Sequence, residues 1–239
     1  MANPTFGLAR VLSKRGICSR SQGEKLAREG RVRVDGRVVR DPEFKIRGHE
    51  RIEVDGGGTE AAAPVYLVMN KPRGIVVSAS DERGRDTVYS LLDGAGLPWL
   101  GPVGRLDKAS EGLLLLSNDT VWAAGITDPA THVPKTYHVQ VAGHPTDDTL
   151  AAMLEGVMDE GEPLRAGAAS LLRQGEKNAW LEVALDEGRN RHIRRLMQVL
   201  GFEVQRLVRV AIGDLPLGEL PKGKWRHLTA GEVAELRRR

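Results

Sequence analysis

The spacing of hydrophobic residues predicts two short helices and three strands at the start of the chain. Residues 8–16 (LARVLSKRG) and 19–30 (SRSQGEKLAREG) each end at a glycine, and Ser19 can cap the second helix, with a glutamine three residues later. In residues 31–40 (RVRVDGRVVR), arginines and valines alternate before an Asp-Gly pair and flank each other after it, which predicts a hairpin. A further strand is expected over residues 51–56 (RIEVDG).

A short stretch of small residues divides the chain. GGGTEAAAP, which begins at Gly56, has the composition of a flexible linker. We therefore predict a first domain over residues 1–55, a linker over residues 56–63 and a second domain over residues 64–239.

The second predicted domain contains more strand patterns than helix patterns. Strands are expected at VYLVMNKP, GIVVSAS, GLLLLSND, KTYHVQVAG, AWLEVALDEG and VQRLVRVAIG, which begin at residues 65, 74, 112, 135, 179 and 204. Helices are expected at DTVYSLL, DTLAAMLEG and NRHIRRLMQVLG, which begin at residues 86, 148 and 190. Because the two kinds do not alternate one for one, we expect an α+β fold with a central, mainly antiparallel or mixed β-sheet flanked by helices.

Positive charge is concentrated in the first domain. The chain has a formal net charge of +3, but residues 1–48 contain 12 Lys or Arg and 5 Asp or Glu, which gives +7 there and −4 for the rest. A basic module on a mildly acidic body favours nucleic acid over an anionic membrane, since no basic amphipathic helix with bulky aromatics is present. A solvated basic face without a partner is the alternative. The candidate phosphate contacts are Arg10, Lys14, Arg15, Arg20, Lys25 and Arg28.

Composition also excludes several classes of protein. No apolar run approaches the roughly 20 residues of a membrane span, and the first residues lack the apolar core of a signal peptide. Cys18 is the only cysteine, so a disulfide or a thiolate metal site within the chain is excluded and a reducing cytoplasm is expected. Without a phosphate-binding glycine motif or a cluster with metal-ligand spacing, we expect neither a nucleotide cofactor nor a metal.

One charged pair stands directly before a run of leucines. In GPVGRLDKASEGLLLLSND, residues 101–119, Arg105 and Asp107 precede a strand that would be buried. Asp107 has no second carboxylate to work with, because Glu111 lies in what looks like a turn and gives no reason for pairing. We therefore expect a nucleophile, or a base that a cation such as Arg194 keeps ionised. The alternative is an aspartate that merely closes a turn at the end of a strand.

The helix predicted from Asn190 carries three arginines. Asn190 can cap it, and apolar residues follow at i, i+3, i+4 and i+7 from Ile193. Arg191, Arg194 and Arg195 gather on the opposite side, near the positive end of the helix dipole, where cations are disfavoured. Cations placed against the helix dipole indicate a bound anion, either RNA phosphate or a carboxylate from elsewhere in the fold. A solvated face without a partner is the alternative.

The predicted helices and hairpin of the first domain occur in a recognisable order. The stretch KRGICSRSQGEKLAREGRVRVDGRVV, within a match from Leu8 to about Val54, resembles the S4 RNA-binding domain, a small helix-helix-hairpin module. The family usually has a second arginine and an Ala-Glu pair where this chain has Ser21, Gln22 and Gly23. The resemblance implies binding to structured RNA.

A set of motifs extends through the second domain in a fixed order. Besides GRLDKASEGLLLLSND these are NKPRG, KTYHV, EGRNRHIRRLMQVLG, RLVRVAIG and LPKGKWRHLT, which begin at residues 70, 135, 187, 206 and 220. Together they resemble the RNA pseudouridine synthases, most closely the branch typified by the small ribosomal subunit enzyme, in which an S4 domain usually comes first. Ser110 and Ser117 stand where threonine is more common and keep the hydroxyls.

The resemblance implies conversion of uridine to pseudouridine without a cofactor or a metal. The N1–C1′ bond breaks, the uracil turns over, and C5 bonds to C1′. Asp107 is implied as the nucleophile, attacking the ribose or the base, and Arg194 as its ionic partner. Tyr137 would stack on the flipped uracil, and Arg105 would enter the vacated space or bind a phosphate.

The remaining expectations concern substrate and partners. Lys71, Arg73, Arg191 and Arg195 are further candidates for RNA binding. We expect a monomeric, cytoplasmic enzyme that acts on ribosomal RNA, with the large subunit favoured over the small. Two other functions stay open. A non-catalytic RNA-binding or assembly factor would not need all four implied site residues, and a nucleoside hydrolase would lack its second carboxylate.

Overall fold

Two units make up the chain in the computed structural model, which describes residues 5–79 and 84–237. The first unit contains residues 1–66, 92–102 and 116–120, and the second contains the rest. The predicted limits of the two domains stay predictions. Within the described ranges, no helix is long and apolar enough to cross a membrane.

The N-terminal module begins with the two predicted helices, α1 (Leu8–Lys14) and α2 (Arg20–Arg28). Ser19 forms the expected capping box. Its hydroxyl accepts from the backbone N–H of Gln22, and its own backbone N–H donates to the Gln22 side chain. Cys18 is buried in the small apolar core that the helices share with the neighbouring strands.

Short strands complete this module. They are β1 (Phe6–Gly7), β2 (Val32–Val34), β3 (Arg37–Val38), β4 (Lys45–Ile46), β5 (Ile52–Val54) and β6 (Gly57–Gly58). β1 pairs with β4, and the others form a sheet in the order β3-β2-β5-β6. The predicted hairpin turn is present, with positive φ at Asp35 (48°) and Gly36 (79°). The segment predicted as a linker is partly structured, because β6 lies in it and the Thr59 hydroxyl donates to the carbonyl of Ile52.

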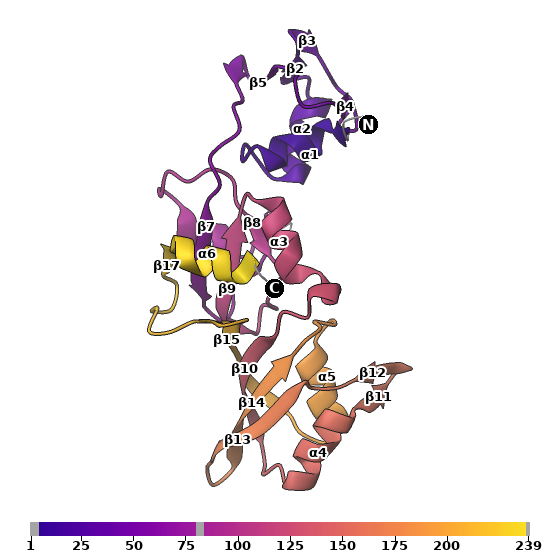
Figure 1. The fold of residues 1–239 in the computed structure, drawn as a ribbon, viewed down its shortest axis with the longest axis vertical. Helices are drawn as coiled ribbons and strands as arrows, with labels where there is room; N and C mark the ends of the chain where they lie inside the picture. Colours follow the sequence, from indigo (N-terminus) through magenta and orange to yellow (C-terminus); the bar gives the residue numbers. More distant parts are fainter. Residues whose placement is uncertain (1–4, 80–83, 238–239) are drawn as a thin grey trace. The chain divides into compact units, whose positions relative to one another are not determined.

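The largest β-sheet among the described residues is mixed and has nine strands (Figure 1). Its order is β13-β14-β10-β15-β9-β7-β17, with β16 beside β15 and β8 beside β9. The strands are β7 (Tyr66–Lys71), β8 (Gly101–Val103), β9 (Glu111–Ser117), β10 (Lys135–Ala142), β13 (Ala168–Gln174), β14 (Asn178–Leu185), β15 (Val204–Ile212), β16 (Leu215–Pro216) and β17 (Trp225–His227). β9 and β15 are parallel, whereas β10 is antiparallel to both β14 and β15. The predicted α+β fold with a mixed sheet is confirmed.

Helices pack against this sheet. They are α3 (Thr120–Thr127), α4 (Asp147–Glu155), α5 (His192–Val199) and α6 (Ala230–Arg237), with the 3₁₀ helices η1 (Val88–Leu92) and η2 (Pro129–Thr131). A hairpin of β11 (Val157–Asp159) and β12 (Glu162–Leu164) follows α4. α4 and α5 lie beside β10 and β14 (Figure 1), where Val139 and Leu181 share a core with Met153 and Leu196. Val139 and Leu181 belong to alternating sets that point to one face of the sheet, as strand geometry requires.

Three local expectations differ from the structure. GIVVSAS does not form a strand in its described part. Val76 makes an isolated bridge to Thr87, and Ser80 lies outside the described residues. DTVYSLL contains the 3₁₀ helix η1 and no α-helix. Asn190 does not cap α5, because the cap position is Arg191, which has a left-handed backbone (φ 50°) and makes no capping side-chain bond. Runs this short do not distinguish between strands, turns and loops that pack on a core.

β9 carries the run of leucines and is buried along its whole length. It lies beside β15 so closely that Gly112 sits opposite Arg209 with a φ of 100°. A side chain at this position would need a backbone conformation that L-residues rarely adopt, and its Cβ would overlap the carbonyl oxygen of Arg209. The glycine of the motif is therefore required by the close approach of two parallel strands.

We predict that Gly112→Ala destabilises the protein by about 3 kcal/mol or more, because unfavourable φ and steric overlap add to each other. A thermal melt followed by circular dichroism measures the effect. Gly125→Ala, in α3, is the matched control. Its added Cβ would meet open space, and alanine is favoured over glycine in a helix by about 1 kcal/mol. Equal melting temperatures for the two variants would contradict the steric argument.

Candidate active site

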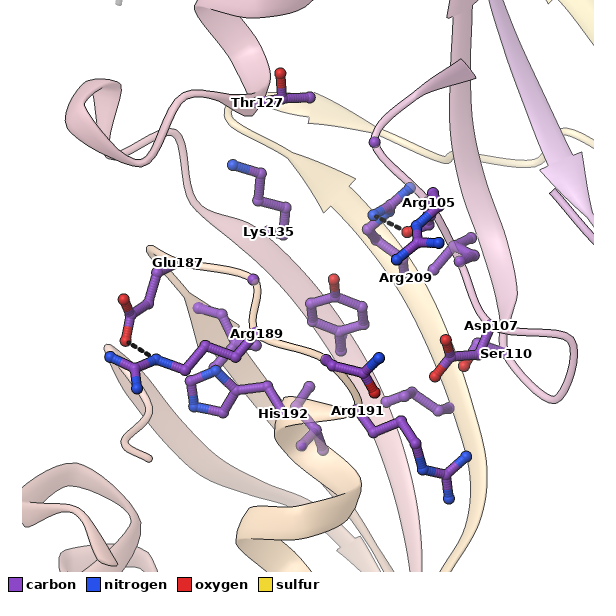
Figure 2. A pocket seen from close by; sticks show the side chains of 18 of the residues that line it. Arg105, Asp107, Ser110, Thr127, Lys135, Glu187, Arg189, Arg191, His192 and Arg209 are labelled. Carbon is purple, nitrogen blue, oxygen red and sulfur yellow. Dashed lines mark hydrogen bonds and ion pairs between the residues drawn. The ribbon is translucent and has the colours of Figure 1, made fainter. Parts of the chain in front are cut away.

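The second unit contains a cavity of about 370 Å³ beside the GRLD loop. The loop over residues 104–110 forms one wall, and the segment over residues 185–193 forms another. Tyr137 on β10 and Arg209 on β15 also line the cavity. Figure 2 shows Asp107 near Arg105 and Arg209 within it. The motifs around residues 105, 135, 187 and 206, which are far apart in the sequence, therefore meet at one place.

The GRLD loop presents the charged side chains of Arg105 and Asp107 to solvent. Gly104 has a φ of 76°, and the loop closes with a hydrogen bond of 2.9 Å from the backbone N–H of Ser110 to the carbonyl of Asp107. Leu106 and Ser110 are buried, whereas Arg105 and Asp107 are exposed. The leucine between them thus anchors a turn that keeps both charges accessible from the cavity.

Lys71, at the end of β7, binds this loop from inside the protein. Its side chain is fully buried, and its ammonium donates to the carbonyls of Pro72 (3.1 Å), Asp107 (3.2 Å) and Ser110 (2.8 Å). Burial lowers the pKa of Lys71 to about 8, and repulsion by Arg209 adds to this, although Asp107 opposes it. We predicted RNA binding for Lys71, which stays a prediction; in the structure its ammonium is buried and already has three carbonyl partners.

Two arginines bind further carbonyls of the same loop. Arg194 on α5 donates from Nη2 to Ala109 (3.3 Å) and from Nη1 to Val204 (2.9 Å). Arg209 on β15 donates from Nη1 to Arg105 (3.4 Å). Cations from β7, α5 and β15 therefore fix the backbone on both sides of Asp107.

The predicted ion pair between Arg194 and Asp107 is not formed as a direct contact. In residues 5–79 and 84–237, no ion pair within 4.0 Å joins the two side chains. They still interact at longer range: burial and Arg191 lower the pKa of Arg194, whereas the charge of Asp107 raises it. Arg194 reaches the GRLD loop through the carbonyl of Ala109, an arrangement that the sequence did not indicate.

The three arginines of the predicted anion-binding face point to different partners. Arg191 is exposed and lines the cavity, but Arg195 donates from Nε to Asp159 (2.5 Å) and from Nη1 to Glu162 (2.7 Å). These bonds raise the pKa of Arg195 and tie α5 to the β11–β12 hairpin. The alternative of a carboxylate from elsewhere in the fold is met for Arg195, whereas Arg194 binds the loop and Arg191 faces the cavity.

Glu111 is buried and paired, contrary to expectation. Its side chain is 3% exposed and accepts from Arg206 Nε (2.6 Å) and Lys222 Nζ (2.6 Å). Burial alone would raise the pKa of Glu111, but these two bonds lower it. The partners are 95 and 111 residues away in the sequence, so no local pattern indicated them.

Other cations in the cavity were missed by sequence reasoning. Lys135 donates to the carbonyl of Ile126 (3.0 Å), and burial, followed by repulsion from Arg209, lowers its pKa. Arg189 lies beside Glu187 at the cavity wall (Figure 2), with a hydrogen bond of 3.1 Å. The described cavity lining contains five basic and three acidic residues, so it suits a polyanion such as RNA. The basic residues are Arg105, Lys135, Arg189, Arg191 and Arg209.

The side chains of Arg73 and Tyr137 are accessible, as their predicted roles require. Arg73 is exposed on the turn after β7, whose Gly74 N–H donates to the carbonyl of Lys108 in the catalytic loop (2.8 Å). Tyr137 is half-buried, lines the cavity and lies directly opposite Arg209 on the neighbouring strand. Their roles stay predictions, and the geometry gives both side chains access to a ligand.

The six basic candidates of the N-terminal module are not equivalent. Arg15 donates to the carbonyls of Thr59 and Glu50 within the module. Three are paired with acids, namely Arg20 with Glu43, Lys25 with Glu29 and Arg28 with Glu24. Arg10 and Lys14 instead lie over the ring of Phe6, 5.0 and 4.0 Å from its centroid. Arg10 and Lys14 are thus the cations of α1 best placed to meet an external anion.

Comparison with known proteins identifies the family. The model of the RNA pseudouridylate synthase family matches residues 65–199, and the model of the S4 domain matches residues 6–52. The chain belongs to the RNA pseudouridylate synthase family and carries an N-terminal S4 domain. The resemblance seen in the sequence motifs is confirmed.

Relatives match along nearly the whole chain. A Bacillus subtilis protein named ribosomal large subunit pseudouridine synthase B is 36% identical over 96% of this chain and 95% of its own length. An Aquifex aeolicus protein named as an uncharacterized RNA pseudouridine synthase is 37% identical over 95% of this chain and 92% of its own. A crystal structure of a pseudouridylate synthase, 32% identical, superposes with a TM-score of 0.67 over 97% of this chain and 99% of that one.

We predict an alkaline limit to turnover that depends on Lys71. The neutral amine has two N–H donors for three carbonyls, so turnover should fall as pH rises through about 8. Lys71→Met should lower turnover at least about tenfold and remove this limb. A pH profile of turnover between pH 6.5 and 9.5 measures both effects.

Lys108→Met, at an exposed position of the same loop, is the control and should keep the alkaline limb. The fall should not reflect unfolding. A lysine whose pKa is lower in the folded state binds fewer protons there, so stability rises between about pH 8 and the ordinary value of 10.5. A Lys71→Met enzyme with an unchanged alkaline limb would contradict the assignment.

Proposed function

We propose that the protein isomerises uridine to pseudouridine in ribosomal RNA, with Asp107 as the nucleophile. The observation that carries this proposal is the exposed Asp107 side chain at a cationic cavity, on a loop whose carbonyls are bound by the buried Lys71 and the half-buried Arg194. The backbone contacts position the Asp107 carboxylate, and the carboxylate itself forms no direct ion pair with these cations. Positioning of a reacting group lowers the barrier by avoiding the entropy cost of bringing it into place.

The proposed reaction conserves all atoms of the nucleotide. Asp107 attacks either the ribose C1′ or the base, the N1–C1′ bond breaks, and the freed uracil turns so that C5 bonds to C1′. The bond between Asp107 and the substrate breaks again, which returns the free carboxylate. The proton on C5 must then leave and N1 must gain one. Tyr137, on the cavity wall, would stack on the uracil and assist removal of this proton. Arg105, exposed beside Asp107, would bind the target's phosphate or fill the space that the flipped base leaves.

The substrate class is inferred from the relatives and the charge distribution. The name of the Bacillus subtilis relative specifies the large ribosomal subunit, so we favour large-subunit RNA over small-subunit RNA as the target. The S4 domain would contribute phosphate contacts that help offset the few kcal/mol needed to unstack a base. We expect the enzyme to act as a monomer in the cytoplasm.

We predict that Asp107→Asn lowers turnover by at least about 10³-fold, because an amide cannot act as the nucleophile. Release of tritium from C5-labelled uridine in ribosomal RNA measures turnover, and a filter-binding assay should show nearly unchanged RNA affinity. Asp148→Asn makes the same chemical change at an exposed position on α4 and should retain turnover. Turnover by Asp107→Asn within tenfold of the wild type would contradict the nucleophile assignment.

We predict that a double Arg10→Gln and Lys14→Gln substitution weakens RNA binding and reduces its salt dependence. Each lost phosphate contact should lower the slope of log affinity against log salt by roughly 0.7–0.9. The control is Lys25→Gln with Arg28→Gln, which removes the same charge from cations that already have acidic partners. Binding measured between about 50 and 200 mM salt should show the larger change for the first pair. Equal slopes for wild type and the Arg10/Lys14 variant would refute phosphate contact there.

A further inference from the structure

One nitrogen of the Arg209 guanidinium, Nη2, has no hydrogen-bond partner among the described residues. The residue is 4% exposed. Its Nε donates to the carbonyl of Leu113 at 2.7 Å and its Nη1 to that of Arg105 at 3.4 Å. Its Nη2 is also buried, but no hydrogen-bond partner for it is found in the part of the chain that the structure describes. Arg209 therefore connects β9 to the catalytic loop and has a donor to spare.

A buried donor without a partner is costly to a folded protein. Leaving a buried polar group unsatisfied costs about 1–3 kcal/mol, and more when the group is charged. Such groups are rare in native structures and often have a functional reason. Arg209 lines the active-site cavity, so an acceptor on a bound ligand is able to complete its hydrogen bonds.

The depth of Arg209 indicates which part of the target nucleotide it meets. Arg105 and Arg191 are exposed around the same cavity and suit phosphates, which stay hydrated (Figure 2). Arg209 is buried and lies directly opposite Tyr137, the residue proposed to stack on the base. Of the parts of a flipped nucleotide, the base enters such a pocket most deeply.

Uracil has the hydrogen-bond acceptors that the unpaired Nη2 donor of Arg209 needs. Guanidinium groups only donate, and uracil presents two carbonyl oxygens, O2 and O4, as acceptors. Cytosine keeps O2 but replaces O4 with an amino group, which donates, so a bond to O4 would also discriminate against cytosine. A site built to bond one polar group rejects an analogue without it by a large factor.

We propose that Nη2 of Arg209 donates a hydrogen bond to a carbonyl oxygen of the flipped uracil, so that Arg209 is a base-recognition residue. This inference rests on the proposed function. It adds a second role to the loop contact that Arg209 makes through Nη1.

The test combines a substitution of Arg209 with the replacement of one oxygen atom of the target uracil by sulfur, and compares the turnover of each combination. Three RNAs carry uridine, 2-thiouridine or 4-thiouridine at the target position, and sulfur is a much weaker acceptor than oxygen. The wild type should process one of the two thio substrates about 10- to 100-fold more slowly in single-turnover experiments. Arg209→Met should be slow on uridine but should show no further loss with that thio substrate. This non-additivity is the expected result.

A purely structural role for Arg209 gives a different outcome. Loss of the loop contact alone would slow all three RNAs by one factor, so the thio penalty would persist in Arg209→Met and overturn the proposal. A wild type indifferent to both thio substitutions would also overturn it. Arg194→Met is the matched control, since it removes another arginine, half-buried, that binds the loop but is not among the residues that line the cavity. It should keep the thio penalty.

A binding measurement covers the case in which Arg209→Met has no measurable turnover. Asp107→Asn should bind the thio RNA less tightly than the uridine RNA, and adding Arg209→Met or Arg209→Lys should remove the difference. A difference that survives both substitutions would overturn the proposal. Turnover of unmodified RNA by the wild type tests the proposed function separately. An enzyme that isomerises uridine but shows no coupling at Arg209 refutes this inference alone.

Discussion

The structure around Asp107 depends on hydrogen bonds from three buried or half-buried cations to the carbonyls of a single loop. Lys71, Arg194 and Arg209 come from β7, α5 and β15, and together they bind the carbonyls of four residues between Arg105 and Ser110. Charge-assisted hydrogen bonds of this kind are stronger than neutral ones. The loop is therefore fixed by its backbone, and the side chains it presents remain available for chemistry.

This arrangement also explains how several cations are accommodated near the exposed carboxylate of Asp107. Buried charges are tolerated only when they have partners, and carbonyl oxygens serve as partners without neutralising the charge. Asp107 therefore lies in the field of Lys71 and Arg194 without being locked in a direct ion pair with either. Glu111 supplies a buried negative charge nearby, but its carboxylate is already bound by Arg206 and Lys222.

Much of the fold followed from local patterns in the sequence. The two N-terminal helices, the capping box at Ser19 and the Asp-Gly hairpin are set by neighbouring residues, and the structure confirms them. The predicted strands over β9, β10, β14 and β15 were also correct, because long runs with clear periodicity specify strands reliably. Errors occurred where runs were short, as at GIVVSAS, and where a helix began without a side-chain cap, as at α5.

The sequence by itself determined the family, the residue types at the site and the basic character of the N-terminal module. Only the tertiary structure decided what each charged residue binds. It buried Lys71 against the carbonyls of the GRLD loop, directed Arg194 and Arg195 to different partners, and brought Arg209 into the cavity. The physical reason is that a charged side chain takes its role from its burial and its partners. At this site those partners lie 30 to more than 100 residues away, so local sequence patterns carry no information about them.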